Sequence, residues 1–136
     1  MLPVSENFAW ADAHSHLQDP RLAPHLPQVF ARARAAGVGL LHVAATAEAD
    51  WHAVAALADA HPGGVICSFG LHPWFIQGRS ARWLENLREI LATRPAGIGE
   101  IGLDGRLEPG LDADRAAILR AQFELAHELA PPASIH

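Results

Sequence analysis

Two histidines one residue apart follow the first apolar run of the chain and could hold a metal ion. Residues 8–11 are typical of a β-strand, and His14 and His16 come directly after them. Side chains alternate between the two faces of a strand, so these imidazoles would point the same way. Neutral imidazole is the commonest metal ligand in proteins. Two ligands do not complete a coordination shell, so the pair predicts a metal site completed by other parts of the chain.

A carboxylate within an apolar run is the second chemical signal. Glu100 lies in residues 97–102, where every other residue is glycine or isoleucine. Burying a carboxylate is costly unless it is paired or bound to a cation. A metal ion would supply the positive charge, and one carboxylate can bridge two ions. The alternative is an ion pair with an arginine at the rim of the fold.

The sequence allows more than one role for the other candidates. His72 precedes Pro73 in a predicted turn, where it could contact a substrate or cap the turn. Asp12 is better placed to orient an imidazole or a bound water than to bind metal itself. The alternative for His14 and His16 is that they are hydrogen-bonded core histidines.

Apolar runs of strand length alternate with amphipathic segments along the chain. The predicted strands are residues 8–11, 38–44, 65–71, 96–103 and 133–136. The predicted helices are residues 26–36, 48–60, a third from 80 or 81 up to Pro95, and 112–129. This alternation predicts an α/β fold with a parallel sheet covered by helices. A doubly wound sheet and a (β/α)-barrel both have this order.

The carboxyl ends of the strands are where parallel α/β folds place their active sites. Six candidate side chains stand at or near those ends: His14, His16, His72, Glu100, Asp104 and His136. His42, by contrast, lies within a predicted strand and is a poor candidate. The sequence therefore predicts that polar, ligand-capable groups converge on one rim.

Composition limits the class of protein. The chain has 136 residues, half of them hydrophobic, which suits one domain over residues 1–136. Its net charge of −5 argues against a broad basic surface for nucleic acid, although bound divalent ions would offset this charge locally. The single Cys67 cannot form an intrachain disulfide, and no signal peptide or membrane-spanning run is evident. We expect a soluble cytoplasmic protein that does not contact membranes.

Four motifs together resemble one known family. They are Asp-Ala-His-Ser-His at 12–16, Gly-Leu-His-Pro at 70–73, Gly-Glu-Ile-Gly-Leu-Asp at 99–104 and Pro-Ala-Ser-Ile-His at 132–136. In this order the chain resembles the TatD family of metal-dependent hydrolases, within the amidohydrolase-like TIM-barrel superfamily. The resemblance implies a (β/α)₈ barrel and hydrolysis of phosphodiesters, typically of DNA from an end.

The resemblance also implies a site with two divalent ions, such as magnesium, manganese or zinc. His14 and His16 would hold one ion, His136 the other, and Glu100 would bridge both and act in catalysis. The residues around them or facing the substrate would be Asp12, His72 and Asp104. DNA would be the substrate, and no stable protein partner is implied.

Two features of the sequence depart from the family pattern. Residues 105–109 replace a bulky stretch, and Arg106 there could meet a phosphate or remain a solvated loop residue. A complete barrel needs about 250 residues, so we expect the first half of one, ending at the start of the fifth strand and lacking a later His and Asp. Its open edge could self-associate. The alternatives to a nuclease are a catalytically incomplete half-barrel, or a related enzyme acting on an amide or ester.

Overall fold

A single parallel sheet forms the centre of the protein. The computed structural model describes residues 9–107 and 110–136. In these parts of the chain the strands follow each other in sequence order, each parallel to the next: β1 (Trp10–Ser15), β2 (Val38–Ala44), β3 (Val65–Phe69), β4 (Gly97–Ile101) and β5 (Ala133–Ile135). A doubly wound sheet reverses its strand order at a switch point. The unbroken order here is that of a (β/α)-barrel, of which these strands form about half.

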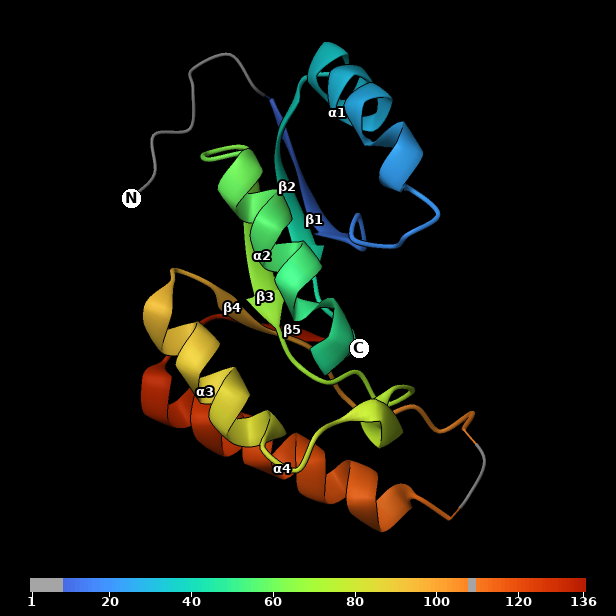
Figure 1. The fold of residues 1–136 in the computed structure, drawn as a ribbon, viewed down its shortest axis with the longest axis vertical. Helices are drawn as coiled ribbons and strands as arrows, with labels where there is room; N and C mark the ends of the chain where they lie inside the picture. Colours follow the sequence, from blue (N-terminus) through green and yellow to red (C-terminus); the bar gives the residue numbers. More distant parts are fainter. Residues whose placement is uncertain (1–8, 108–109) are drawn as a thin grey trace.

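A helix connects each strand to the next and lies outside the curved sheet (Figure 1). The helices are α1 (Leu26–Ala35), α2 (Trp51–Ala60), α3 (Trp83–Thr93) and α4 (Asp112–Leu129). Short 3₁₀ turns cover Ala23–His25, Glu48–Asp50 and Ile76–Gly78. Helices α3 and α4 pack side by side, and an ion pair between Arg88 and Glu128 joins them.

The predicted elements are all present, and β2 and α4 have the predicted bounds. The first strand was placed too early, because β1 continues to Ser15 and includes His14; residue 8 lies outside the described part of the chain. The helix expected from residue 48 begins with a 3₁₀ turn, and α3 begins at Trp83 rather than at residue 80 or 81. Strands β3 and β4 are shorter than predicted and end at Phe69 and Ile101.

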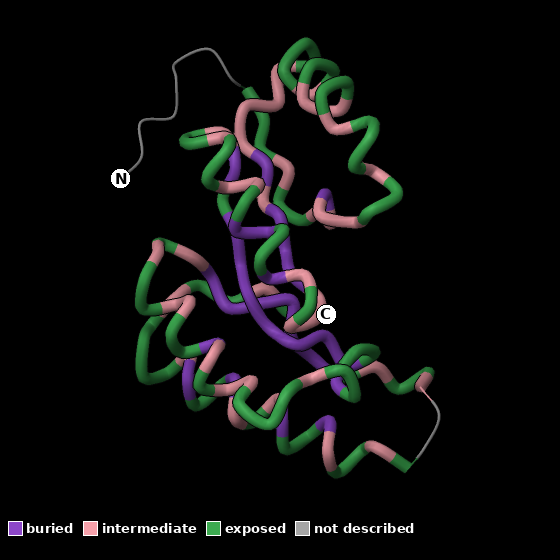
Figure 2. Tube along the Cα trace, in the orientation of Figure 1, coloured by how far each residue is buried: buried purple, intermediate pink, exposed green. Residues whose placement is uncertain are grey.

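The hydrophobic core lies between the sheet and its helices. Val43, Phe69, Leu87 and Ile98 are fully buried in it. Burying one such side chain contributes roughly 1.5–3 kcal/mol. Figure 2 shows the buried residues running along the central strands, whereas α1 has no buried residue. The core therefore makes the centre of the sheet a rigid support for the rim.

The two outer strands of the described sheet are β1 and β5. Self-association through these edges stays a prediction. No helix in the described residues has both the length and the apolar character needed to cross a membrane. The cytoplasmic location also stays a prediction.

Candidate metal centre

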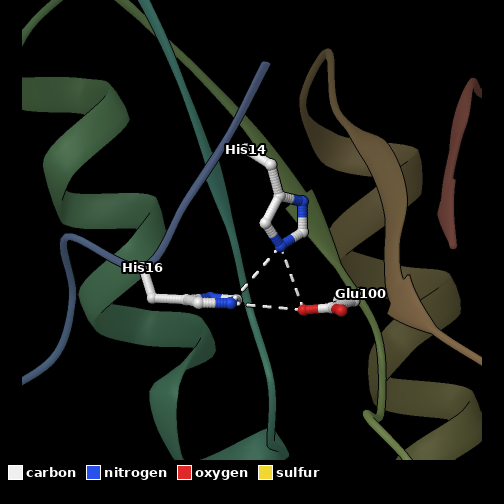
Figure 3. A group of neighbouring side chains, drawn as sticks. All are labelled: His14, His16 and Glu100. Carbon is white, nitrogen blue, oxygen red and sulfur yellow. Dashed lines mark hydrogen bonds and ion pairs between the residues drawn. The ribbon is translucent and has the colours of Figure 1, made fainter. Parts of the chain in front are cut away.

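Strand β1 and strand β4 bring three ligand-capable atoms together at the carboxyl end of the sheet. His14 Nε2 lies 3.3 Å from His16 Nε2 and 3.0 Å from Glu100 Oε2. His16 Nε2 lies 3.2 Å from the same oxygen (Figure 3). Nitrogen or oxygen ligands held about 2.1 Å from a tetrahedral ion are about 3.4 Å apart. The three atoms therefore have the spacing of ligands around one ion, and we call them the first donor group.

Local hydrogen bonds turn both imidazoles of this group toward Glu100. The Asp12 carboxylate accepts a bond from the backbone N–H of His14, 3.1 Å away. Nδ1 of His14 hydrogen-bonds the hydroxyl of Ser134 at 3.0 Å, and Nδ1 of His16 lies 2.8 Å from the carbonyl oxygen of Ala44. Bonds of this kind at the far ring nitrogen fix the orientation of metal-binding histidines.

The bond to Ala44 decides which nitrogen of His16 is free. A carbonyl oxygen only accepts hydrogen bonds, so Nδ1 of His16 must carry the hydrogen. In the neutral ring Nε2 then presents a lone pair to the carboxylate of Glu100, which also only accepts. Two acceptors 3.2 Å apart repel each other unless a proton or a cation lies between them. The donor set therefore fits a metal ion.

Glu100 is the buried centre of the site. It is 6% exposed, and its backbone N–H donates to the carbonyl of Ala45. Its ion pairs within the described chain are all with histidines, so the predicted alternative of an arginine partner does not apply. Burial raises the pKa of Glu100, but the hydrogen bond with His136, the attraction of His72 and His14 in their protonated forms and the hydrogen bond with His14 outweigh it, so the pKa lies below its usual value.

A second donor group uses the other oxygen of the same carboxylate. His136 Nδ1 lies 2.8 Å from Glu100 Oε1, and His72 Nε2 lies 3.7 Å from it. His72 Nε2 and His136 Nδ1 are 3.1 Å apart. Gly102 permits this approach, because a methyl group there would lie 2.9 Å from Cβ of His136. Glu100 is thus shared between two groups of histidines, one oxygen facing each.

His72 differs from the other three histidines. It is 5% exposed, and its Nδ1 accepts a hydrogen bond from the backbone N–H of Trp74. Burial lowers the pKa of His72 to about 4, so the ring is neutral near pH 7 and carries its hydrogen on Nε2. It therefore presents a hydrogen-bond donor to His136 and Glu100, not a lone pair that could bind a metal ion. This arrangement agrees with the predicted role of His72 beside the metal ligands. Its distances to Glu100 and His136 alone would be compatible with a ligand.

Asp104 holds the outer side of His136. Its oxygens accept bonds from the Arg106 guanidinium, from the indole N–H of Trp74 at 2.9 Å and from Nε2 of His136 at 3.3 Å. The bonds from Arg106 hold the pKa of Asp104 well below its usual range. Although burial lowers the pKa of His136, its bonds to Asp104 and Glu100 outweigh this and raise it.

Comparison with known families agrees with this geometry. The model of the family described as TatD related DNase matches residues 11–136. This chain belongs to that family. The match includes all seven predicted site residues. The structure places four of them, His14, His16, His72 and His136, around Glu100, while Asp104 bonds His136 and Asp12 bonds the backbone of His14.

Relatives within the TatD family are about twice as long as this chain. An uncharacterized metal-dependent hydrolase, YjjV of Escherichia coli (strain K12), is 32% identical over 92% of the chain and 49% of its own length. A 3′-5′ ssDNA/RNA exonuclease TatD of Pantoea sp. (strain At-9b) is 32% identical over 92% of the chain and 48% of its own length. The chain thus spans about half the length of the curated relatives it matches.

Solved structures of TatD homologues have the same fold. The crystal structure of YjjV from Escherichia coli superposes with a TM-score of 0.86 at 32% identity, covering 93% of this chain and 50% of that one. A TatD family hydrolase from Entamoeba histolytica gives a TM-score of 0.75 at 17% identity, over 91% and 48% of the two chains, which shows the fold alone. The described strands therefore correspond to half of a TIM barrel.

Sequence reasoning missed several residues that shape this TatD site. Ser134 lies in β5, two residues before His136, which directly follows the strand. The period of two predicts that both side chains point the same way, so this signal was available. Gln122 is fully buried on α4, where its side chain bonds both backbone groups of Leu71 and so fixes the segment before His72. Nothing in the sequence marked Trp74. His42, which was judged a poor candidate, bonds Ser68 and the carbonyl of Ala13 and lies outside both donor groups.

Proposed function

We propose that this chain provides the site for a hydrolase that uses two divalent metal ions to cleave phosphodiester bonds in DNA. The observation that supports this most is the sharing of Glu100. One of its oxygens lies 3.0 and 3.2 Å from His14 and His16, and the other lies 2.8 Å from His136. A bridging carboxylate is a means of holding two ions a few ångströms apart. The family match and the exonuclease relatives favour a phosphodiester as the substrate.

Each donor group would hold one ion. His14, His16 and Glu100 Oε2 would bind the first ion, while His136 and Glu100 Oε1 would contribute to the second. When bound, such a pair supplies an activated water, polarises the phosphate and stabilises the leaving oxygen. Imidazole-rich donors suit zinc, and carboxylates suit magnesium or manganese, so these three ions remain the candidates.

The surrounding side chains prepare this site. Ala44 and Ser134 fix the rings of the first donor group before any ion arrives. Neutral His72 directs an N–H toward His136, while Asp104 holds the other nitrogen of that ring. The negative net charge of the chain is compatible with an anionic substrate, because the ions would place positive charge where the phosphate binds.

The two donor groups offer different numbers of protein ligands. A catalytic metal site commonly has three protein ligands and one open position. The first donor group has three such atoms, and the second has two if His72 acts as a hydrogen-bond donor. We propose that the second ion takes further ligands from outside the two groups, and that hydrolysis belongs to the assembly in which they are supplied.

Hydrolysis is tested by incubating the purified protein with Mn²⁺, Mg²⁺ or Zn²⁺ and uniformly labelled single-stranded DNA, following release of nucleotides. Bound metal is measured in parallel. Glu100→Gln should lower both metal occupancy and nucleotide release by at least about 100-fold, because it removes the shared charge while keeping the shape. The matched control is Glu128→Gln, which changes a surface carboxylate paired with Arg88.

Two results would contradict the proposal. One is nucleotide release that persists in Glu100→Gln. The other is a wild-type protein that binds metal and hydrolyses amide or ester substrates while leaving DNA intact, which would support the related amidohydrolase-like activity.

A further inference from the structure

Two exposed aromatic side chains stand at the rim beside the metal centre. Trp74 is 54% exposed and Phe75 is 45% exposed, and Pro73 separates them from buried His72. The indole ring of Trp74 lies 5.3 Å from the His72 ring and 6.1 Å from the His136 ring, centroid to centroid. Large apolar side chains are costly to leave in water, and those next to a polar site commonly mark a binding surface. Trp74 therefore needs an explanation that the metal centre alone does not give.

The indole is held in place although it is exposed. Its N–H donates to Oδ2 of Asp104 at 2.9 Å, and its contacts with His72 and His136 are edge-to-face, at interplanar angles of 90° and 73°. An aromatic ring that is already oriented loses little conformational freedom when a ligand packs on it. Trp74 is thus prepared to bind a flat apolar group next to the second donor group.

A cation binds the same carboxylate as the indole. The side chain of Arg106 is 79% exposed, and its Nε and Nη2 bind the two oxygens of Asp104 at 3.1 and 3.0 Å. Asp104 thereby binds an indole and a guanidinium as well as the ring of His136. Guanidinium groups bind phosphate well, and aromatic rings stack on nucleobases whatever their sequence. An aromatic ring with a neighbouring arginine is the combination used to bind single-stranded nucleic acid.

We propose that Trp74 is the stacking platform for a nucleobase next to the scissile phosphate of single-stranded DNA, with Arg106 contacting a neighbouring phosphate. This inference rests on the proposed function, and it adds the side chains that would hold a base and a neighbouring phosphate of a single strand, the substrate printed in the names of exonuclease relatives. In a duplex both faces of each base are covered by neighbouring bases, so a base must leave the stack before an indole can pack on it. The subsite should therefore select unpaired DNA with little preference for sequence.

Binding can be measured without relying on turnover. The probe is a fluorescein-labelled oligothymidylate of about ten nucleotides with phosphorothioate linkages that resist cleavage, followed by fluorescence anisotropy in the presence of Mn²⁺. Trp74→Ala should weaken binding about ten-fold or more. Trp74→Phe should keep most of the affinity, because it removes the bond to Asp104 but retains a ring. The matched control is Trp10→Ala, at the start of β1, which removes a tryptophan that is 68% exposed.

A probe with abasic sites separates stacking from a structural effect. Removing the bases should weaken binding to the wild-type protein as much as Trp74→Ala does, and should have little further effect on Trp74→Ala itself. A paired duplex of the same length should bind more weakly than the single strand. Metal occupancy should be the same in Trp74→Ala and the wild type, because no donor atom is changed.

The outcomes distinguish this subsite from the activity. If Trp74→Ala binds the oligonucleotide as tightly as the wild type, or if the wild type does not bind it, the stacking platform is wrong. If Trp74→Phe loses as much affinity as Trp74→Ala, the indole acts through Asp104 and the platform is again wrong. If binding depends on Trp74 but no DNA is cleaved under any metal, the proposed hydrolysis fails and the subsite stands.

Discussion

The two donor groups share one carboxylate, yet their histidines are prepared in different ways. In the first group the far nitrogens of His14 and His16 are occupied by Ser134 and the carbonyl of Ala44, so that Nε2 of each ring faces Glu100. In the second group His72 uses its far nitrogen to accept the backbone N–H of Trp74. The hydrogen of His72 is then on Nε2, the atom that faces the site.

This difference shows that residue type and distance do not identify a metal ligand. His16 and His72 both place Nε2 near an oxygen of Glu100, at 3.2 and 3.7 Å. The partner at the opposite ring nitrogen decides whether that atom offers a lone pair or a hydrogen. The first group can accept an ion as it stands, whereas His72 would have to give up its bond to Trp74.

The largest expected contrast is between His16→Gln and His72→Gln. Removing His16 takes away a ligand, so affinity for the first ion should fall by about 100-fold or more. His72→Gln keeps a side chain that can donate to His136, so metal affinity should fall by less than about ten-fold. Isothermal titration with Zn²⁺ or Mn²⁺ measures both affinity and stoichiometry.

An equal loss in these two variants would break the comparison, because it would make His72 a ligand like His16. Circular dichroism at matched temperature provides the folding control, since His72 is buried and His16 is not. A variant that no longer folds would show lost secondary structure along with lost metal binding.

The metal affinities of the two donor groups should also depend differently on pH. The pKa of His136 is raised, because its bonds to Asp104 and Glu100 outweigh the effect of burial. Below that pKa an ion must displace a proton from Nδ1, so its affinity should fall by up to about ten-fold per pH unit as the pH decreases, and level off above the pKa. The second ion should therefore dissociate first in metal titrations repeated from about pH 8 down to about pH 5. Loss of the first ion at higher pH than the second would reverse the comparison.

Much of the fold was predictable because it depends on patterns that act locally. Apolar runs and helical spacing predicted each strand and α-helix of the described residues, and Pro131 and Pro132 correctly marked the end of α4. The choice between a doubly wound sheet and a barrel was not local. It depends on which strands are neighbours. The family resemblance implied the barrel, and the order β1 to β5 in the sheet confirms it.

The candidate site likewise has residues that local patterns predicted and residues that they did not. Glu100 was predictable because a lone carboxylate in an apolar strand must find positive charge, and His14 and His16 because of their spacing. The role of His72 was not predictable, since it depends on the backbone N–H of Trp74, and backbone groups look the same in every sequence. The clash that requires Gly99 was equally hidden, because a methyl group there would lie 2.7 Å from Ser134 only once β5 has packed against β4.

Ser134→Ala should give the smallest effect and test the first donor group most selectively. The substitution keeps the Cβ that packs against Gly99, so the strand pair should remain intact. It removes the hydroxyl that bonds Nδ1 of His14 at 3.0 Å, so this ring loses its orientation while His16 keeps its bond to Ala44. Affinity for the first ion should fall about ten-fold, the low end for loss of a group that orients a ligand, because water can partly replace a hydroxyl at an exposed ring. Titration should show the second ion unaffected, and an equal loss at both ions would mean that Ser134 acts by positioning β5 and its His136 rather than His14.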